Sequence, residues 1–160
     1  MVYVYGDNID TDRIIPGKYT KTLDLSALAD HVLEDLDPGF SKSVQRGDII
    51  VAGKNFGCGS SREQAPLALK QSGVSVIIAE DFARIFFRNA INIGLAVLEI
   101  GKHEIEIGAQ VEYDLATGIV KDLSQNKEYP ATKLPQIMID ILDEGGLVPY
   151  LKKNKKYKLS

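Results

Sequence analysis

Residues 49–69 read IIVAGKNFGCGSSREQAPLAL and combine three patterns in one continuous stretch. The first four residues are all apolar, as expected for a strand that is buried on both faces. The loop that follows holds three glycines, one cysteine, two adjacent serines and an arginine. From Ala65 the apolar residues recur at helical spacing until Ser72 and Gly73, which indicates a helix. This order of strand, glycine-rich loop and helix is typical of a parallel α/β unit.

The chain continues with the same alternation. Residues 74–79 form a continuous apolar run and predict a second buried strand. A helix is expected next, with Asp81 as its possible cap, apolar side chains as far as Ile93, and Gly94 at its end. Residues 95–100 predict a further strand. The fold class we predict is therefore α/β, with a mainly parallel sheet flanked by helices.

The segments before this unit are less regular. Residues 2–5 predict a short strand, and residues 6–22, which are rich in Asp, Asn, Thr, Pro and Gly, predict a long loop. Residues 25–36 have apolar side chains at helical spacing, with Asp24 or Ser26 as the cap.

The second part of the chain changes character. It predicts two short strands and then two short helical pieces, at residues 110–114, 118–121, 137–142 and 147–153. We find no linker long enough to separate independent domains, and 160 residues suit one domain with a single core. We therefore expect one domain over residues 1–160, with a basic tail at 152–160.

Composition and charge exclude some classes of function. The formal net charge is −3, so the strong basic field of a nucleic-acid-binding protein is missing. The lysines of the tail indicate a solvated end, or, as the alternative, a contact with an acidic partner surface. No apolar run approaches the ~20 residues that a membrane span requires, and no leader pattern is visible. We expect a cytoplasmic protein that binds neither nucleic acid nor a membrane.

The few metal-binding side chains limit the cofactors. The chain has one cysteine, Cys58, and two histidines, His31 and His103, which lie far apart. These residues are too few for a closed zinc site and for the thiolates that usually hold an iron–sulfur cluster. We expect no metal and no cofactor bound by this chain, so a cluster, if one is needed, belongs to another chain.

The glycine loop has the physical features of an anion site. Gly57 and Gly59 allow backbone conformations that other residues avoid, and they let a ligand approach the main chain. The loop leads towards a helix N-terminus, where free N–H groups favour an anion. Arg62 adds a planar, two-pronged donor for a carboxylate. The loop therefore predicts a carboxylate or phosphate site.

A purely structural interpretation of the same loop is also open. Ser60 and Ser61 each precede Glu63 or Gln64 by three residues, the spacing of a capping box, so one or both serines could only cap the helix. Pro66 requires an irregular first turn or a helix that starts after Ser61. The residue orders of a phosphate-binding P-loop and of a serine nucleophile elbow are both absent, and a catalytic cysteine is disfavoured.

Three segments resemble one protein family. The stretches YGDNIDTDRIIPGKY at residues 5–19, GKNFGCGSSREQAPLAL at 53–69 and IIAEDFARIFFRNAINIGL at 77–95 are similar to the small subunits of 3-isopropylmalate dehydratase, in the aconitase superfamily. The resemblance implies a β/β/α swivelling domain of the aconitase C-terminal type. It also implies interconversion of 2- and 3-isopropylmalate through isopropylmaleate, in leucine biosynthesis, with a large subunit that holds a 4Fe-4S cluster.

The resemblance assigns roles to residues of two motifs. Ser60 matches the catalytic base, Ser61 a neighbour that holds substrate oxygen or shapes the turn, and Arg62 a carboxylate-binding arginine. Asp12 matches an acidic active-site residue, with an Asx-turn as the structural alternative, and Thr11 is its neighbour and a weaker candidate for substrate binding.

Lys21 leaves the substrate open. In this family an apolar residue after the Asp motif suits an isopropyl group, and an arginine suits the extra carboxylate of homoaconitate. Lys21 departs from the apolar pattern, although a lysine stem can also lie along an apolar group. Homoaconitate and a substituted malate such as dimethylmalate are therefore alternative substrates, and the substrate is a small dicarboxylate or tricarboxylate. An alternative from another class of function is a module that binds an anion and catalyses no reaction.

Overall fold

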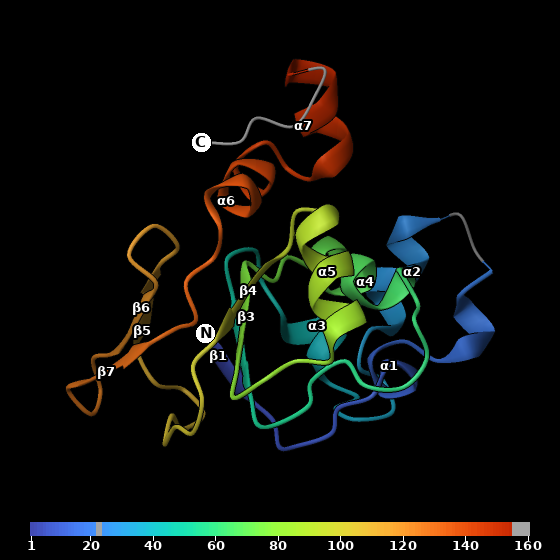
Figure 1. Ribbon diagram of the computed structural model, residues 1–160. Coiled ribbons are helices and arrows are strands. Elements are labelled where there is room, and N and C mark those ends of the chain that lie inside the picture. The colour runs from blue at the N-terminus through green and yellow to red at the C-terminus, as the bar shows by residue number, and fades with distance from the viewer. Residues whose placement is uncertain (22–23, 155–160) are drawn as a thin grey trace.

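The structure is a computed structural model, and it describes residues 1–21 and 24–154 (Figure 1). The strands are β1 (Val2–Val4), β2 (Ile49–Ala52), β3 (Val76–Ala79), β4 (Ala96–Glu99), β5 (Val111–Asp114), β6 (Ile119–Asp122) and β7 (Lys127–Pro130). The helices are α1 (Thr11–Ile14), α2 (Leu25–His31), α3 (Phe40–Ser43), α4 (Gln64–Ser72), α5 (Arg84–Asn92), α6 (Gln136–Asp143) and α7 (Leu147–Asn154), with a 3-10 helix η1 (Gly17–Tyr19).

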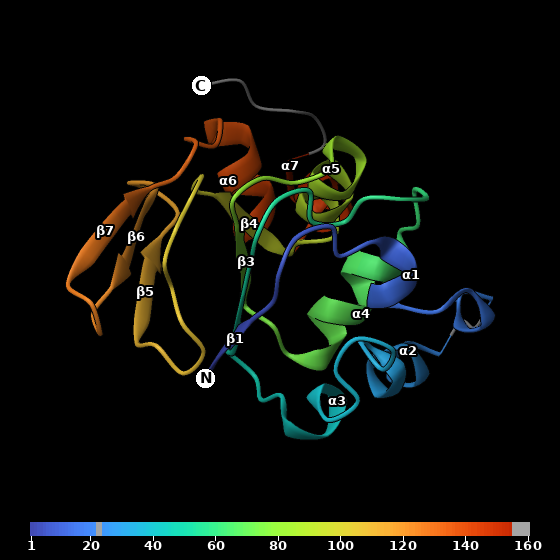
Figure 2. The same ribbon diagram turned by 90° about the horizontal axis from the view of Figure 1, so that it is seen from below.

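The predicted parallel sheet is confirmed. Strands β1, β2, β3 and β4 pair in that order, and every pair is parallel. Parallel crossovers are right-handed, so consecutive crossovers in one direction pass over the same face of the sheet. Figure 2 shows the result as three layers, with helices α1, α2, α4 and α5 on one side of the parallel sheet and β5, β6 and β7 on the other, while α6 lies by β4 and contributes to both cores. This arrangement agrees with the β/β/α domain that the resemblance implied.

The alternation of side chains along the strands builds two cores. On a strand, successive side chains point to opposite faces. The helix-facing core takes from the parallel sheet the buried side chains of Tyr3, Ile50, Ala52, Ile77, Ala79 and Val97. The other core takes Val2, Ile49, Val51, Val76, Ile78, Ala96 and Leu98. Both faces are covered, which explains why these strands are continuously apolar in sequence.

The antiparallel sheet has a strand that the sequence analysis missed. Strands β5 and β6 fall close to their predicted positions, and β7 adds a third strand in register Val120↔Tyr129 with β6. Tyr129 is half-buried and the other three residues of β7 are exposed, so the segment has no apolar run that would mark it as a strand. Its position comes from backbone pairing with β6 at the edge of the sheet.

The region before β2 contains more helix than predicted. The expected loop at residues 6–22 holds α1 and η1, and Asp10 caps α1 by accepting a hydrogen bond from the Arg13 amide at 2.8 Å. The helix α2 ends at His31 rather than at Leu36, because Leu33 is fully buried with a left-handed backbone, φ 57°. Of the two predicted caps, Asp24 is the one that caps α2. Helix α3 was not predicted.

The C-terminal region agrees with the sequence prediction. Helices α6 and α7 lie at the predicted positions, and the predicted basic tail begins inside α7, where Lys153 pairs with Glu144 at 2.8 Å. Residues 155–160 of that tail lie outside the described residues.

Across residues 1–21 and 24–154, no helix has both the length and the apolar character that crossing a membrane requires.

The carboxyl ends of the parallel strands bring three loops together. Between the loops that follow β1 and β2, the Asn8 amide donates to the Lys54 carbonyl at 2.8 Å and the Thr11 amide to the Cys58 carbonyl at 2.8 Å. Between the loops after β2 and β3, Phe56 and Phe82 form an isolated parallel bridge. Because parallel strands end at one edge of their sheet, α1, the glycine loop and the start of α5 meet there.

Candidate functional site

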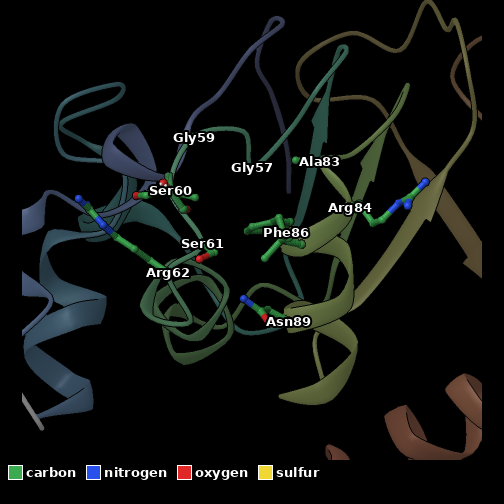
Figure 3. A pocket seen from close by; sticks show the side chains of 11 residues that line it. Gly57, Gly59, Ser60, Ser61, Arg62, Ala83, Arg84, Phe86 and Asn89 are labelled. Carbon is green, nitrogen blue, oxygen red and sulfur yellow. Dashed lines mark hydrogen bonds between the residues drawn. The ribbon is translucent and has the colours of Figure 1, made fainter.

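A pocket of about 220 Å³ opens between the glycine loop, α1 and α5 (Figure 3). Its walls come from three distant parts of the sequence. The residues that line it are Thr11, Gly57, Gly59, Ser60, Ser61, Arg62, Ala83, Arg84, Ile85, Phe86 and Asn89. Of the six predicted site residues, Thr11, Ser60, Ser61 and Arg62 line this pocket, and Asp12 and Lys21 are outside its lining.

Gly57 fixes the distance between the glycine loop and α5. Its backbone is left-handed, with φ 82°, and a Cβ atom at this position would lie 2.2 Å from Cγ of Phe86. No side chain fits in that space, so only glycine allows the loop to pack against the aromatic ring. This contact forms the floor between the two walls of the pocket.

The loop presents free backbone donors. Within the part of the chain that the structure describes, none of the amides from Gly59 to Ser61 donates a hydrogen bond to a carbonyl or a side chain. Gly59, at φ 96°, turns the backbone at the start of this run. Successive free N–H groups in a tight loop can bind an anion, so the carboxylate or phosphate site stays a prediction that this loop is able to serve.

The capping interpretation of the serines is wrong. Helix α4 begins at Gln64, its N-cap residue is Glu63, and no side chain makes a capping hydrogen bond there. The constraint set by Pro66 is confirmed, because the helix starts after Ser61. Both serine hydroxyls are therefore left for other contacts.

The hydroxyl of Ser60 lies beside the hydroxyl of Thr11. Thr11 Oγ1 donates to the Ser60 carbonyl at 3.0 Å and lies 3.2 Å from Ser60 Oγ. Thr11 is 2% exposed, so the hydroxyl is held in a nearly water-free position. A Cβ atom at Gly59 would lie 3.4 Å from the same oxygen, and glycine therefore leaves room for this arrangement.

Arg62 and Asp12 form an ion pair with each other. Arg62 Nη1 donates to Asp12 Oδ1, the Arg62 side chain is 27% exposed, and that of Asp12 is 67% exposed. In Figure 3 the guanidinium group points away from the space between the loop and α5. The turn role that was the alternative for Asp12 is taken by Asp10.

Ser61 and Asn89 face the pocket from opposite walls. Both residues line the pocket, and Figure 3 shows the Asn89 side chain directed from α5 towards the loop that carries Ser61. The Ser61 hydroxyl has no hydrogen-bond partner among the described residues, so it is available to a ligand. The sequence analysis assigned no site residue to the segment that forms α5, so Asn89 and Phe86 were missed as pocket residues. The sequence offered one signal for these residues, because the glycine-rich motif at 53–69 is followed closely by the aromatic motif at 77–95. Only the fold shows that the two motifs are in contact.

Lys21 is not among the residues that line the pocket. The segment before it packs on the first turn of α4, where Gln64 Nε2 donates to the Thr20 carbonyl at 3.1 Å. A Cβ atom at Gly17 would lie 3.4 Å from both terminal nitrogens of Arg62, so this segment covers one side of the guanidinium. Lys21 itself is exposed, and its neighbour Thr22 lies outside the described residues.

The helix α5 starts later than predicted. Asp81 does not cap it, because the carboxylate accepts a hydrogen bond from the Asn55 amide instead. The helix begins at Arg84, after a bridge between the loops, and this places Arg84 and Ile85 on the rim of the pocket.

The remaining reactive groups lie apart from the pocket lining. Burial raises the pKa of the Cys58 thiol, and the negative charge of Asp10 raises it further. His103 bonds the Ala52 carbonyl at 2.8 Å, and His31 pairs with Glu34 at 2.8 Å. Residues 1–21 and 24–154 include no group of three or more His, Cys, Asp or Glu side chains that could hold a metal ion.

Comparisons with known proteins agree with this architecture. The family model of the Aconitase C-terminal domain matches residues 36–103. The 3-isopropylmalate dehydratase small subunit of Aquifex aeolicus is 57% identical over 94% of this chain and 92% of that protein. A methanogen homoaconitase small subunit from Methanothermobacter thermautotrophicus is 55% identical over 94% of this chain and 89% of that protein. The crystal structure of 3-isopropylmalate dehydratase from Methanocaldococcus jannaschii matches with a TM-score of 0.90 and 47% identity, over 96% of this chain and 92% of that one.

Proposed function

Because the chain belongs to the family of 3-isopropylmalate dehydratase small subunits, we propose that it is the small subunit of a two-chain hydro-lyase of the leucine pathway. In this proposal one swivelling domain, residues 1–160, works in the cytoplasm on a small dicarboxylate. The enzyme removes water from 2-isopropylmalate and adds it back to the neighbouring carbon of isopropylmaleate, which yields 3-isopropylmalate.

The observation that carries the proposal is the hydroxyl pair of Ser60 and Thr11 beside a run of free amides. In the proposed reaction Ser60, as an alkoxide, takes a proton from the carbon beside a carboxylate, and the hydroxyl on the adjacent carbon leaves as water after it gains a second proton from a donor outside this chain. Ser60 returns the proton when water adds in the opposite sense. A serine is a weak base, so the site has to stabilise the negative charge with donors that are already in place. The free amides and the Thr11 hydroxyl are such donors.

Arg62 and Ser61 are the proposed substrate-binding groups. A guanidinium can hold a carboxylate with two parallel hydrogen bonds. Arg62 is paired with Asp12, so a substrate carboxylate exchanges with Asp12 or joins it on the guanidinium. We propose that Asp12, once released, faces the hydroxyl and water side of the reaction, and that Thr11 contributes to binding through Ser60.

The iron–sulfur cluster expected in this family does not fit the side chains of this chain. The sequence has one cysteine, and no metal-binding group occurs within the described residues. We propose that a large subunit holds the 4Fe-4S cluster, which supplies a Lewis acid for the leaving hydroxyl, and that this chain is active only in the assembled pair.

The substrate is proposed from family membership and charge. A relative named for homoaconitase is 55% identical, close to the 57% of the Aquifex aeolicus subunit, so overall identity discriminates poorly between isopropylmalate and homoaconitate. Lys21 is the residue of this chain that could bind the extra carboxylate. Isopropylmalate is favoured because most of the similar relatives carry that name.

Turnover of the reconstituted pair tests the proposal. The chain would be combined with its large subunit, the cluster loaded without oxygen, and the unsaturated acid followed by ultraviolet absorbance. Isopropylmalate and homocitrate would be offered in parallel, with dimethylmalate as a third substrate. We expect the highest kcat/KM for isopropylmalate, and a loss of at least about 100-fold for Ser60→Ala, the scale of general base catalysis.

Two results would contradict the proposal. Near-normal turnover by Ser60→Ala, with association to the large subunit intact, would remove Ser60 as the base. Binding of a dicarboxylate by the isolated chain, with no turnover in any pair, would favour an anion-binding module instead.

A further inference from the structure

Helix α5 presents an apolar side chain and two guanidinium groups on its solvent face. Ile85 lines the Ser60 pocket and is 53% exposed, and Arg84 and Arg88 are exposed as well. Residues three and four positions apart are neighbours on a helix, so these three side chains form one surface, here called the α5 ridge.

The α5 ridge carries two positive charges, and the groove that both arginines line contains one carboxylate, that of Glu99. Among the residues that the structure describes, neither Arg84 nor Arg88 has an ion-pair partner. Two like charges four positions apart on a helix repel each other. The chain as a whole carries a net charge of −3, so this local positive charge is not a property of the general surface. A partner that brings carboxylates would relieve the repulsion.

The α5 ridge separates two hollows of the surface. Arg84 lines both the Ser60 pocket and a neighbouring groove of about 460 Å³. The groove has an apolar part made by Phe82, Phe87 and Met138. Glu99 also lies in the groove, and its carboxylate accepts a hydrogen bond from the Phe82 amide at 3.2 Å. In Figure 3 the Arg84 side chain points away from Ser60, towards this outer side of α5.

We propose that the α5 ridge and its groove are the docking surface for the large iron–sulfur subunit. The inference rests on the proposed function, which requires substrate held by the partner to reach Ser60. The partner must then cover the open pocket, and covering it on the α5 side buries Ile85. A matching surface would offer an apolar recess for Ile85 and carboxylates for the two arginines, since buried apolar anchors with arginine neighbours dominate many interfaces.

Affinity for the large subunit tests the proposal without relying on activity. Binding of the purified chain to the large subunit would be measured by isothermal titration calorimetry, with Ile85→Lys as the test variant and Ile107→Lys as its matched control. Ile107 is 73% exposed and lies outside both hollows, so it differs from Ile85 mainly in position. We expect Ile85→Lys to weaken binding at least 100-fold, and Ile107→Lys to bind as tightly as the unchanged chain. Replacing both arginines by alanine should reduce the salt dependence of binding.

Three outcomes separate this inference from the proposed function. Equal affinity of Ile85→Lys and the unchanged chain would overturn the docking surface and leave the two-chain enzyme standing. No association of the unchanged chain with the large subunit would overturn both. Hydrogen exchange gives an answer that needs no variant: amides of residues 84–92 should become protected in the complex, and unchanged exchange there would contradict the proposal.

Discussion

The Thr11 hydroxyl oxygen lies 3.0 Å from the carbonyl oxygen of Ser60 and 3.2 Å from its side-chain oxygen. Thr11 has one hydroxyl hydrogen, and both of its neighbouring acceptor oxygens belong to Ser60. While Ser60 is protonated, Thr11 can donate to the carbonyl and accept from the serine hydroxyl. Once Ser60 has lost its proton, the Thr11 hydrogen can turn towards the alkoxide. The pair can therefore hold either protonation state of the proposed base.

We predict that Thr11→Val lowers kcat and leaves KM nearly unchanged. A hydrogen bond to a charged group contributes about 1.5–3 kcal/mol, which corresponds to a roughly 10- to 150-fold loss of rate. Thr11→Ser keeps the hydroxyl and should retain most of the activity. Steady-state kinetics of the assembled pair would decide this, and an equal loss in both variants would assign Thr11 a packing role only.

Arg62→Lys should raise KM more than it lowers kcat. A lysine keeps the charge but loses the planar fork that matches a carboxylate, so one charge-assisted hydrogen bond, worth about 1.5 kcal/mol, is lost. We expect a KM about 10-fold higher. Arg13→Lys is a suitable control, because Arg13 is an exposed arginine of the neighbouring helix. If both variants had the KM of the unchanged enzyme, Arg62 would not bind the substrate.

Gly57→Ala should destabilise the fold and distort the pocket. The left-handed backbone costs an alanine about 1–2 kcal/mol, and overlap with Phe86 adds about 1–3 kcal/mol. The free energy of unfolding should therefore fall by about 2–5 kcal/mol. At Gly6, where a Cβ atom meets nothing within 4 Å, the same change should cost less than about 0.5 kcal/mol. Denaturant titration of the two variants makes this comparison, and equal midpoints would show that the loop moves away from Phe86 easily.

The Cys58 thiol should be alkylated more slowly than a free cysteine at neutral pH. Only the thiolate reacts, and burial together with the charge of Asp10 raises the pKa, so the rate curve moves to higher pH. Iodoacetamide labelling of the folded and unfolded chain at several pH values measures the shift. Asp10→Asn, which can still cap α1, should move the curve part of the way back. If the labelling rate of the folded chain rose at the same pH as that of the unfolded chain, or at a lower pH, the thiol would not have the raised pKa that burial and Asp10 predict.

Lys21→Leu should increase the preference for isopropylmalate over homocitrate. If the ammonium group binds the extra carboxylate, its removal lowers kcat/KM for homocitrate and spares isopropylmalate. Lys18→Leu is the matched control, since Lys18 is also an exposed lysine of the same segment. Unchanged substrate ratios in both variants would place Lys21 in solvent throughout the reaction.

Local signals in the sequence predicted local structure well where one interaction dominated, and failed where two competed. Ser60 and Ser61 have the spacing of helix caps, yet Pro66 and the packing of Gly57 on Phe86 shift the helix start to Gln64. Asp81 has the position of a cap, and its carboxylate instead bonds the Asn55 amide of the adjacent loop. In each case a contact with a residue distant in sequence replaced the local one.

The sequence by itself determined the parallel sheet and the chemistry of the glycine loop. Apolar runs such as residues 74–79 can be buried only between two layers, and the serines, glycines and Arg62 carry their donors wherever the loop lies. Only the tertiary structure decided that Thr11 holds Ser60, that Asp12 pairs with Arg62, and that α5 forms the second wall. The first two contacts join residues about 50 positions apart, and the contact of the glycine loop with α5 joins Gly57 to Phe86, 29 positions apart. They form because parallel strands bring their carboxyl ends to one edge of the sheet.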